Sequence, residues 1–151
     1  RSYAILCIFW MLVIFWFSAQ VADDSQEMSD FFVRLLDALF SLDIMKNEII
    51  QDMTSFLVRK AAHMSEYAIL AILLGLTIRE YKKEPWLLLA LTATAAYAAT
   101  DEFHQLFVPG RSGQLKDVLI DTAGGALGLG LLALILYLQR RRKMKEYEKL
   151  S

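Results

Sequence analysis

The sequence predicts an all-α membrane protein, a bundle of four transmembrane helices with an extracellular amphipathic helical segment between the first and second spans. Hydrophobic residues make up 56% of the 151 residues and the mean hydropathy is +0.38, a balance too apolar for an ordinary soluble domain. The apolar residues gather in four stretches, which we treat as one membrane domain covering residues 1–151. The formal net charge of −1 argues against a nucleic-acid partner.

The first predicted span covers residues 3–19, an unbroken apolar stretch near the lower length limit for crossing a bilayer. A cleaved signal peptide is the competing interpretation, because Arg1 resembles a charged leader and Ala22 could end a cleavage site. The stretch is richer in aromatic residues than a signal usually is, and Gln20 fits such a site poorly, so we expect a retained span. Cys7 is the single cysteine, which excludes an intramolecular disulfide. The true start of the chain is left open.

Residues 20–56 are polar and acidic, and we expect them to form an external loop. Within the loop, Ser29 or Asp30 can cap a helix whose apolar residues recur at i, i+4 and i+8 on one face. Those residues are Phe31, Phe32, Leu35, Leu36, Leu39 and Phe40. We expect this helix to lie on the membrane or to pack on the mouth of the bundle, as a gating lid or as plain packing.

The remaining spans are predicted at residues 57–78, 86–106 and 118–138. A short charged turn separates the first two of these. Pro109 and Gly110 turn the chain after the third predicted span, since proline cannot continue a helix and glycine accepts positive φ. In the last span, Gly124 and Gly128 form a G-x-x-x-G motif that lets another helix backbone approach closely. That partner is either another helix of the same chain or a second copy in a homo-oligomer.

Basic residues set the expected orientation. The tail at residues 139–151 is strongly basic, and the turn between the second and third spans carries Arg79, Lys82 and Lys83. Positive charge next to a span marks the cytoplasmic side of a membrane. We therefore expect a multi-pass protein of the cell membrane with both termini in the cytoplasm and the acidic loop outside.

Polar residues gather at the external ends of the last three predicted spans, where each charge is costly unless something compensates it. At about 1.5 Å of rise per helical residue, His63, Asp101 and Asp121 reach the same depth near the outer edge of the bilayer. Helical spacing also aligns the polar residues on one face within each span. The sequence predicts that they form one outward-open pocket, whose candidates are Arg59, Lys60, His63, Glu66, Asp101, Glu102, His104, Gln105, Arg111, Asp117 and Asp121.

Several kinds of chemistry fit these side chains. Arg59, Lys60, Arg111 and Lys116 could hold a phosphate or carboxylate, while the carboxylates and histidines could handle protons. No Ser-His-Asp order and no cysteine nucleophile is discernible in the sequence, so covalent catalysis has no candidate and an enzymatic role is left open. The plain alternative is a structural ion-pair network, although buried ion pairs are weak evidence of stability. A small transporter is a further alternative.

A divalent metal ion is another possible occupant of the predicted pocket. The spacings His63-x-x-Glu66 and Asp101-x-x-His104 each place a nitrogen and an oxygen ligand on one helix face. The candidate ligands are His63, Glu66, Asp101, His104 and Asp121. Two arginines nearby would repel such an ion, which weighs against this interpretation.

Four motifs in order carry a family resemblance. They are F-S-A-Q with Ser25 and Ser29 after the first span, R-K-A-A-H-M-S-E-Y at residues 59–67, A-A-Y-A-A-T-D-E-F-H-Q-L-F-V-P-G-R-S-G at residues 95–113, and K-D-V-L-I-D-T-A-G-G-A-L-G at residues 116–128. In this combination the chain resembles the VanZ-like family of bacterial membrane proteins, named for a member associated with resistance to teicoplanin. The resemblance implies a four-span cell-envelope protein of a Gram-positive bacterium, and it brings no settled biochemical activity.

The resemblance also directs the expected partners. Teicoplanin carries a fatty-acyl chain, and its target is a lipid-linked cell-wall precursor. We therefore expect the pocket to bind or modify an amphiphile at the outer leaflet, such as a membrane lipid, a lipid-linked cell-wall precursor or a lipoglycopeptide.

Overall fold

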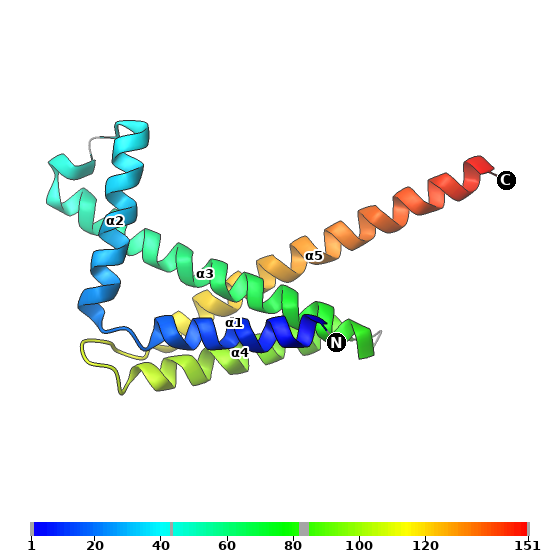
Figure 1. Cartoon of the computed structure of the whole chain (residues 1–151), viewed down its shortest axis with the longest axis horizontal. Helices are drawn as coiled ribbons and strands as arrows, with labels where there is room; N and C mark the ends of the chain where they lie inside the picture. Colours follow the sequence, from blue (N-terminus) through cyan, green and yellow to red (C-terminus); the bar gives the residue numbers. More distant parts are fainter. Residues whose placement is uncertain (1, 43, 82–84, 151) are drawn as a thin grey trace.

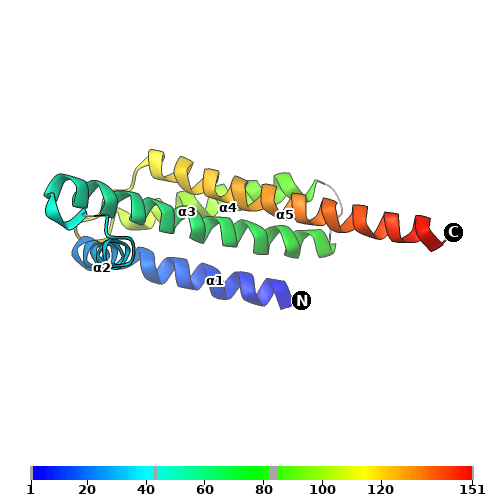
Figure 2. The ribbon, with the colours of Figure 1, turned by 90° about the horizontal axis from the view of Figure 1, so that it is seen from above.

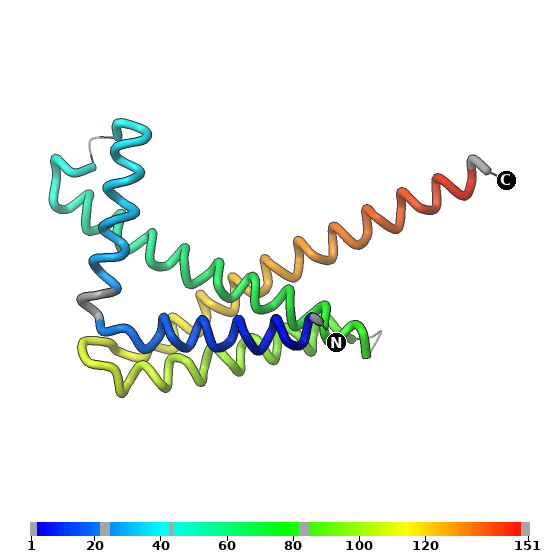
Figure 3. The backbone as a smooth tube through the Cα atoms, in the orientation of Figure 1, coloured from blue at the N-terminus to red at the C-terminus, as the bar shows by residue number. Residues whose placement is uncertain are grey.

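The computed structural model describes residues 2–42, 44–81 and 85–150, and these form α-helices with one short 3-10 helix (Figure 1). The elements are α1 (Ser2–Ser18), α2 (Ala22–Phe40), η1 (Ile44–Lys46), α3 (Glu48–Tyr81), α4 (Trp86–Gln105) and α5 (Leu115–Leu150). α1, α3, α4 and α5 extend along the length of the molecule, whereas α2 stands across it at one end (Figures 1 and 2). The backbone trace in Figure 3 shows how α2 leads away from the bundle and the chain returns through η1 into α3. The all-α prediction is confirmed.

Within the described residues, two helices are long and apolar enough to cross a membrane, Glu48–Tyr81 and Leu115–Glu148. A shorter apolar helix covers Tyr3–Ser18. α4 has nearly the predicted bounds, but with its alanines, threonines and two carboxylates it is not among the helices that meet this criterion. Length and composition therefore support two of the four predicted spans, those at residues 57–78 and 118–138. Lys82 and Lys83, used in the orientation argument, and Arg1, used in the signal-peptide alternative, lie outside the described residues.

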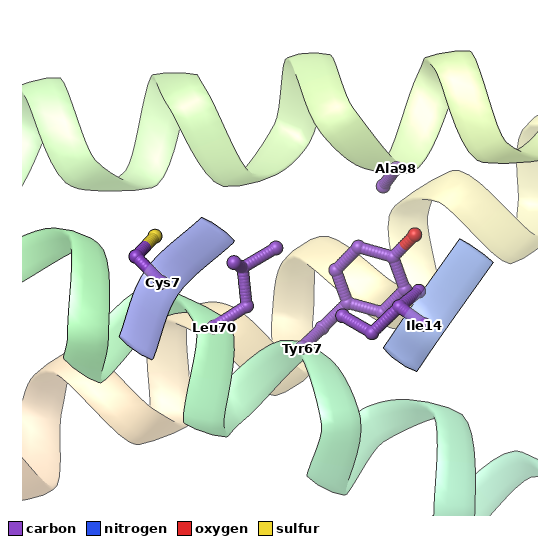
Figure 4. Packing of buried hydrophobic residues seen from close by; sticks show 5 residues of the cluster. All are labelled: Cys7, Ile14, Tyr67, Leu70 and Ala98. Atoms are coloured by element: carbon purple, nitrogen blue, oxygen red, sulfur yellow. The ribbon is translucent and has the colours of Figure 1, made fainter. Parts of the chain in front are cut away.

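α3 is the central helix, because it contacts α1, α2, α4 and α5. Its buried residues between Tyr67 and Gly75 recur at spacings of three and four, which places them on one stripe of the helix. One core cluster joins Tyr67 and Leu70 of α3 to Cys7 and Ile14 of α1 and to Ala98 of α4. Figure 4 shows the Tyr67 ring beside Ile14, with its hydroxyl directed toward α4. This cluster joins α1 and α4 to the central helix.

The predicted G-x-x-x-G motif of α5 packs against α3. A Cβ atom on Gly124 would lie 2.4 Å from the carbonyl oxygen of Met64, and one on Gly128 would lie 2.4 Å from that of Ala68. Only glycine allows the two backbones to approach this closely. Both glycines are buried within the chain. The motif therefore packs against a helix of the same chain, the first of the two alternatives given above. A homo-oligomer through Gly124 and Gly128 would have to displace α3.

Hydrogen bonds from side chain to backbone fasten α1 to the bundle. The indole nitrogen of Trp10 donates to the carbonyl of Glu66 at 2.9 Å, and the hydroxyl of Tyr97 donates to the carbonyl of Met11 at 2.7 Å. Large apolar side chains on the other face of α1 stay exposed, namely Ile5, Leu6, Ile8, Phe9, Leu12, Phe15 and Trp16. Such a face suits contact with lipid.

α2 differs from its prediction. The expected caps Ser29 and Asp30 lie inside the helix, which begins at Ala22. Their side chains make other hydrogen bonds: Ser29 donates to the carbonyl of Ser25, and Asp30 accepts from the hydroxyl of Ser55. The buried face of α2 consists of Ser25, Ser29 and Val33. The apolar face predicted from the sequence stays largely exposed, with Phe31, Phe32, Leu35, Leu39 and Phe40 at 44–66% exposure. The predicted basic tail, in turn, continues α5 as helix as far as Leu150.

Candidate functional site

A cavity of about 190 Å³ lies where α3, α4, α5 and the loop between α4 and α5 meet. Eight of the sequence-predicted candidates line it: Arg59, Lys60 and His63 from α3, Glu102 and Gln105 from α4, Arg111 from the loop, and Asp117 and Asp121 from α5. Phe56, Gly110, Ser112 and Gln114 complete its lining. We call this space the polar cavity. Residues from three helices and one loop meet here, as the shared depth of the polar groups predicted.

The loop between α4 and α5 closes one side of the polar cavity. Gly110 has a φ of 74°, so the predicted turn needs a residue that tolerates the left-handed region. Beyond the turn, the backbone N–H of Gln114 donates to Glu102 Oε2 at 2.8 Å. A Cβ atom on Gly113 would lie 2.1 Å from the carbonyl oxygen of Glu102. The glycines thus allow the loop to lie directly against the end of α4.

One close ion pair forms among the described residues at this site. Lys60 Nζ lies 2.6 Å from Asp117 Oδ1, and both side chains are only about one-fifth exposed. His63 Nδ1 and Glu66 Oε2 are 3.8 Å apart, which is too long for a hydrogen bond. The dense ion-pair network of the structural alternative is therefore not seen here.

The two arginines of the site are held by neutral groups. Arg59 donates to the amide oxygen of Gln26, and Arg111 Nε donates to the carbonyl of Gln20 at 3.2 Å. Neither guanidinium forms an ion pair with a carboxylate in the part of the chain that the structure describes. Burial and the nearby Arg59 both lower the pKa of Arg111 from its ordinary value, and the side chain remains a cation because arginine does not deprotonate in proteins.

A second cavity, of about 220 Å³, lies between the end of α1, α2 and α3. Its wall is mostly apolar and includes Phe17, Met28, Phe32, Val58 and Ala62, with Ser25 and Ser29 from α2. Charged and polar groups occur at one end, where Arg59, His63, Glu66 and Arg111 line it. We call this space the apolar cavity. The two cavities share Arg59, His63 and Arg111, so these residues form the wall between them.

Three predicted pocket residues lie elsewhere. Asp101 is 3% exposed and lines neither cavity; it accepts from Gln105 at 3.4 Å and has the hydroxyls of Ser18 and Tyr67 beside it. The ring of His104 lies 4.5 Å from that of Phe15 and also lines neither cavity. Glu66 lines the apolar cavity instead of the polar one. The expectation of one common pocket does not hold for these three.

The reason is the geometry of the helix. Successive residues of an α-helix point about 100° apart, since 3.6 residues complete a turn. Asp101 and Glu102 therefore cannot both face the same space, and Asp101 faces α1 and α3 while Glu102 faces the polar cavity. Sequence spacing identified which residues share a helix face but not which neighbour each face meets.

The described residues do not form a metal centre of the expected kind. Among them, no group of three His, Cys, Asp or Glu side chains comes close enough together to hold a metal ion. Three of the five candidate ligands line one or both cavities, and the other two, Asp101 and His104, lie on α4 outside both cavities. The divalent-metal hypothesis gains no support from this arrangement.

Sequence reasoning missed the residues that hold the arginines in place. Gln20 and Gln26 accept their hydrogen bonds, and Gln26 also donates to Asp30 at 3.0 Å. A signal was present, because Ser25 with Ser29 and Gln26 with Asp30 form two polar pairs at spacing i, i+4 along the helix. That polar stripe could have been recognised as the contact face of α2.

The comparison with known families bears on what this bundle is. A family model described as VanZ/LLP1 matches residues 3–137. The chain belongs to the VanZ/LLP1 family. The match includes both cavities and every predicted pocket residue, which agrees with the resemblance inferred from the four motifs. No curated protein and no solved structure matches the chain. VanZ/LLP1 membership and the two long apolar helices together indicate a membrane protein.

Proposed function

We propose that this VanZ/LLP1 family member is a four-span protein of the cell membrane that binds an amphiphilic cell-envelope ligand in an outward-facing pocket. The observation that carries the proposal is the meeting of the polar and apolar cavities at Arg59, His63 and Arg111. Binding sites for small molecules commonly combine apolar walls with a few placed polar groups. A space that is polar at one end and apolar at the other matches the build of an amphiphile.

The position of α2 supports the proposed place of the pocket in the membrane. With the long axis of the bundle along the bilayer normal, α2 lies in the plane of the membrane surface (Figures 1 and 2). An amphipathic helix in that plane buries its apolar face in the interface. The exposed Phe31, Leu35 and Leu39 provide such a face. The two cavities would then open at the level of the outer leaflet.

The four spans of the proposal are α1, α3, α4 and α5, with both termini in the cytoplasm. α4 has 20 residues, which at about 1.5 Å per residue approaches the ~30 Å hydrocarbon core. The basic end of α5 and Arg79 at the end of α3 support the inside assignment for that end of the bundle.

A membrane-impermeant thiol reagent tests the orientation. Cys7 is the single cysteine and is buried, so a Cys7→Ala background carrying one new cysteine reports one position. We expect the reagent to label Ser41→Cys in intact cells and Gln139→Cys only in permeabilised cells. Labelling of Gln139→Cys in intact cells would contradict the proposed orientation.

The family resemblance gives the proposed ligand its biological setting. We propose a lipid-linked cell-wall precursor or an acylated glycopeptide at the surface of a Gram-positive bacterium, with protection against teicoplanin as the outcome. A purely structural charged cluster is less well supported, because the described site residues form one close ion pair and leave both arginines without a carboxylate partner.

Teicoplanin susceptibility in a sensitive Gram-positive host tests this proposal. The wild type is compared with Glu66→Gln and Arg111→Ala, which change cavity walls, and with His104→Ala, which changes a residue outside both cavities. At matched membrane levels, we expect the first two variants to lose protection and His104→Ala to keep it. Full protection in all three variants, or no protection from the wild type, would contradict the proposal.

A further inference from the structure

The wall shared by the two cavities indicates the charge of the ligand. We infer that the pocket takes an amphiphile with a single hydrocarbon chain and an anionic head, with the head between Arg59 and Arg111 and the chain in the apolar cavity. The shared chemistry is that of a carboxylate or a phosphate monoester on one chain. This inference rests on the proposed function and extends it by naming the head charge and the chain.

The hydrogen bonds of the two arginines favour an anion. Gln26 and Gln20 hold the guanidiniums through neutral oxygens, which position the cations without neutralising them. Arg59 Nε is buried and has no hydrogen-bond partner, so at least one donor is still free. A guanidinium offers five donors in a planar fork that suits carboxylate and phosphate oxygens. An oxyanion between the two cations would also relieve their mutual repulsion.

The neighbouring carboxylates do not replace such a ligand. Asp117 is paired with Lys60, and Glu102 accepts from the backbone of Gln114. Glu66 is the one carboxylate among the described residues that line the apolar cavity, and it faces two arginines there. The end of the apolar cavity nearest the shared wall thus keeps an excess of positive charge.

The polar cavity offers room for the rest of a head group. Asp121 is 2% exposed, lines this cavity, and has no hydrogen-bond partner for its Oδ2 atom. A buried carboxylate oxygen without a partner is costly, so a hydroxyl or amide donor there would be bound favourably. A head group that carries such a donor next to its anionic group would therefore use both sides of the shared wall.

The apolar cavity has the size and lining for part of one chain. Its volume of about 220 Å³ exceeds the ~150 Å³ of an apolar cavity that accommodates benzene. The hydroxyl of Ser29 is already bonded to the carbonyl of Ser25, so Ser29 offers no free donor to the cavity. Met28 and Phe32 are 40% and 48% exposed, so the cavity reaches the surface of α2. The remainder of the chain can leave there into the membrane.

Displacement of a fluorescent fatty acid tests the head charge. The full chain in phosphatidylcholine nanodiscs is loaded with dansyl-labelled undecanoic acid, and four competitors are titrated: dodecanoate, dodecyl phosphate, dodecyl maltoside and dodecyltrimethylammonium. We expect one or both of the anionic competitors to displace the probe at least about tenfold more effectively than the neutral and cationic ones. Whichever of dodecanoate and dodecyl phosphate displaces the probe more effectively shows whether the site prefers a carboxylate or a phosphate. Equal displacement by all four would overturn the inference.

Variants of the arginines locate the head. Arg59→Gln and Arg111→Gln should each weaken the binding of the more effective anionic competitor by about tenfold or more, since each removes a charged hydrogen bond. Arg59→Lys keeps the charge and should retain part of the affinity. Arg34→Gln is the matched control, because Arg34 is exposed on α2 and lines neither cavity. Equal affinity in both Gln variants and the control would contradict the assigned head site.

Ala62→Phe tests the chain site, with Ala61→Phe as its control. Both alanines are exposed on α3, but only Ala62 lines the apolar cavity, so the first variant fills it with little risk to folding. We expect Ala62→Phe to block the probe and Ala61→Phe to bind it. If Ala62→Phe blocked probe binding but the competitors showed no preference for an anionic head, this inference would be wrong and the proposed function would still stand. Normal binding in Ala62→Phe and in both Gln variants would refute both.

Discussion

Substituting alanine for the buried glycines of α5 tests the close contact on which the bundle depends. In Gly128→Ala, the new Cβ atom would lie 2.4 Å from the carbonyl oxygen of Ala68 and 2.8 Å from its Cα. These are backbone atoms of a central helix and cannot turn aside as a side chain can. Ordinary contact begins at 3.4 Å, so α5 must move about 1 Å away from α3 at this point.

The cost follows from the packing along the helix pair. A gap of 0.5–1 Å removes about a quarter to a half of the attraction between the atoms it separates, and overpacking of this kind costs about 1–3 kcal/mol. Gly130→Ala is the matched control, because a Cβ atom there meets nothing within 4 Å. Both variants gain the same helix propensity from alanine, so that contribution cancels between them. We expect Gly128→Ala to be about 2 kcal/mol less stable than Gly130→Ala.

The two variants are unfolded in detergent micelles by titration with SDS, and the loss of helix is followed by circular dichroism. The titrations give the free energy of unfolding of each variant. Equal stability of Gly128→Ala and Gly130→Ala would refute the close approach of α5 to α3. Chemical crosslinking of the same samples tests the alternative role of the glycine motif, an interface between two chains. If Gly128→Ala abolished a crosslinked dimer and left stability unchanged, the glycines would serve an interface between chains.

Three further predictions concern the polar cavity. Gly113→Ala should destabilise the protein by about 1–3 kcal/mol, because its Cβ atom would lie 2.1 Å from the carbonyl oxygen of Glu102, and thermal unfolding in micelles measures this. Gly110→Val should lower the unfolding temperature, because a β-branched residue is strained at a φ of 74°, whereas wild-type stability would contradict the assigned turn. Lys60→Met leaves Asp117 without its partner, so it should cost more stability than the double variant Lys60→Met with Asp117→Leu, which removes both charges. Equal losses in the two variants would show that the pair is not formed.

The parts of the fold that follow from local chemistry could be predicted from the sequence. The observed α4 ends one residue from its predicted boundary, and Gly110 has the positive φ expected after Pro109. Proline and glycine act on the backbone directly, so no knowledge of neighbouring helices was needed. The close packing through Gly124 and Gly128 could also be inferred as one of two alternatives, since the spacing itself permits close approach.

The parts that depend on tertiary contacts could not be predicted. Ser29 and Asp30 have the residue types of helix caps, but their hydrogen bonds go to Ser25 and Ser55, and the helix begins earlier. Asp101 shares its helix end with Glu102, yet it is buried against α1. Periodicity gives the face of each residue, and only the packing of helices decides what that face meets.

The tethering of Arg59 and Arg111 links the pocket to the membrane surface. Both guanidiniums are bonded to the segment formed by Gln20 and α2, Arg59 through the side chain of Gln26 and Arg111 through the backbone of Gln20. The same segment carries the exposed apolar face of α2. A shift of α2, for example with a change in lipid packing or surface tension, would alter both tethers at once. The geometry of the charged wall is therefore set partly by the bilayer in which the protein resides.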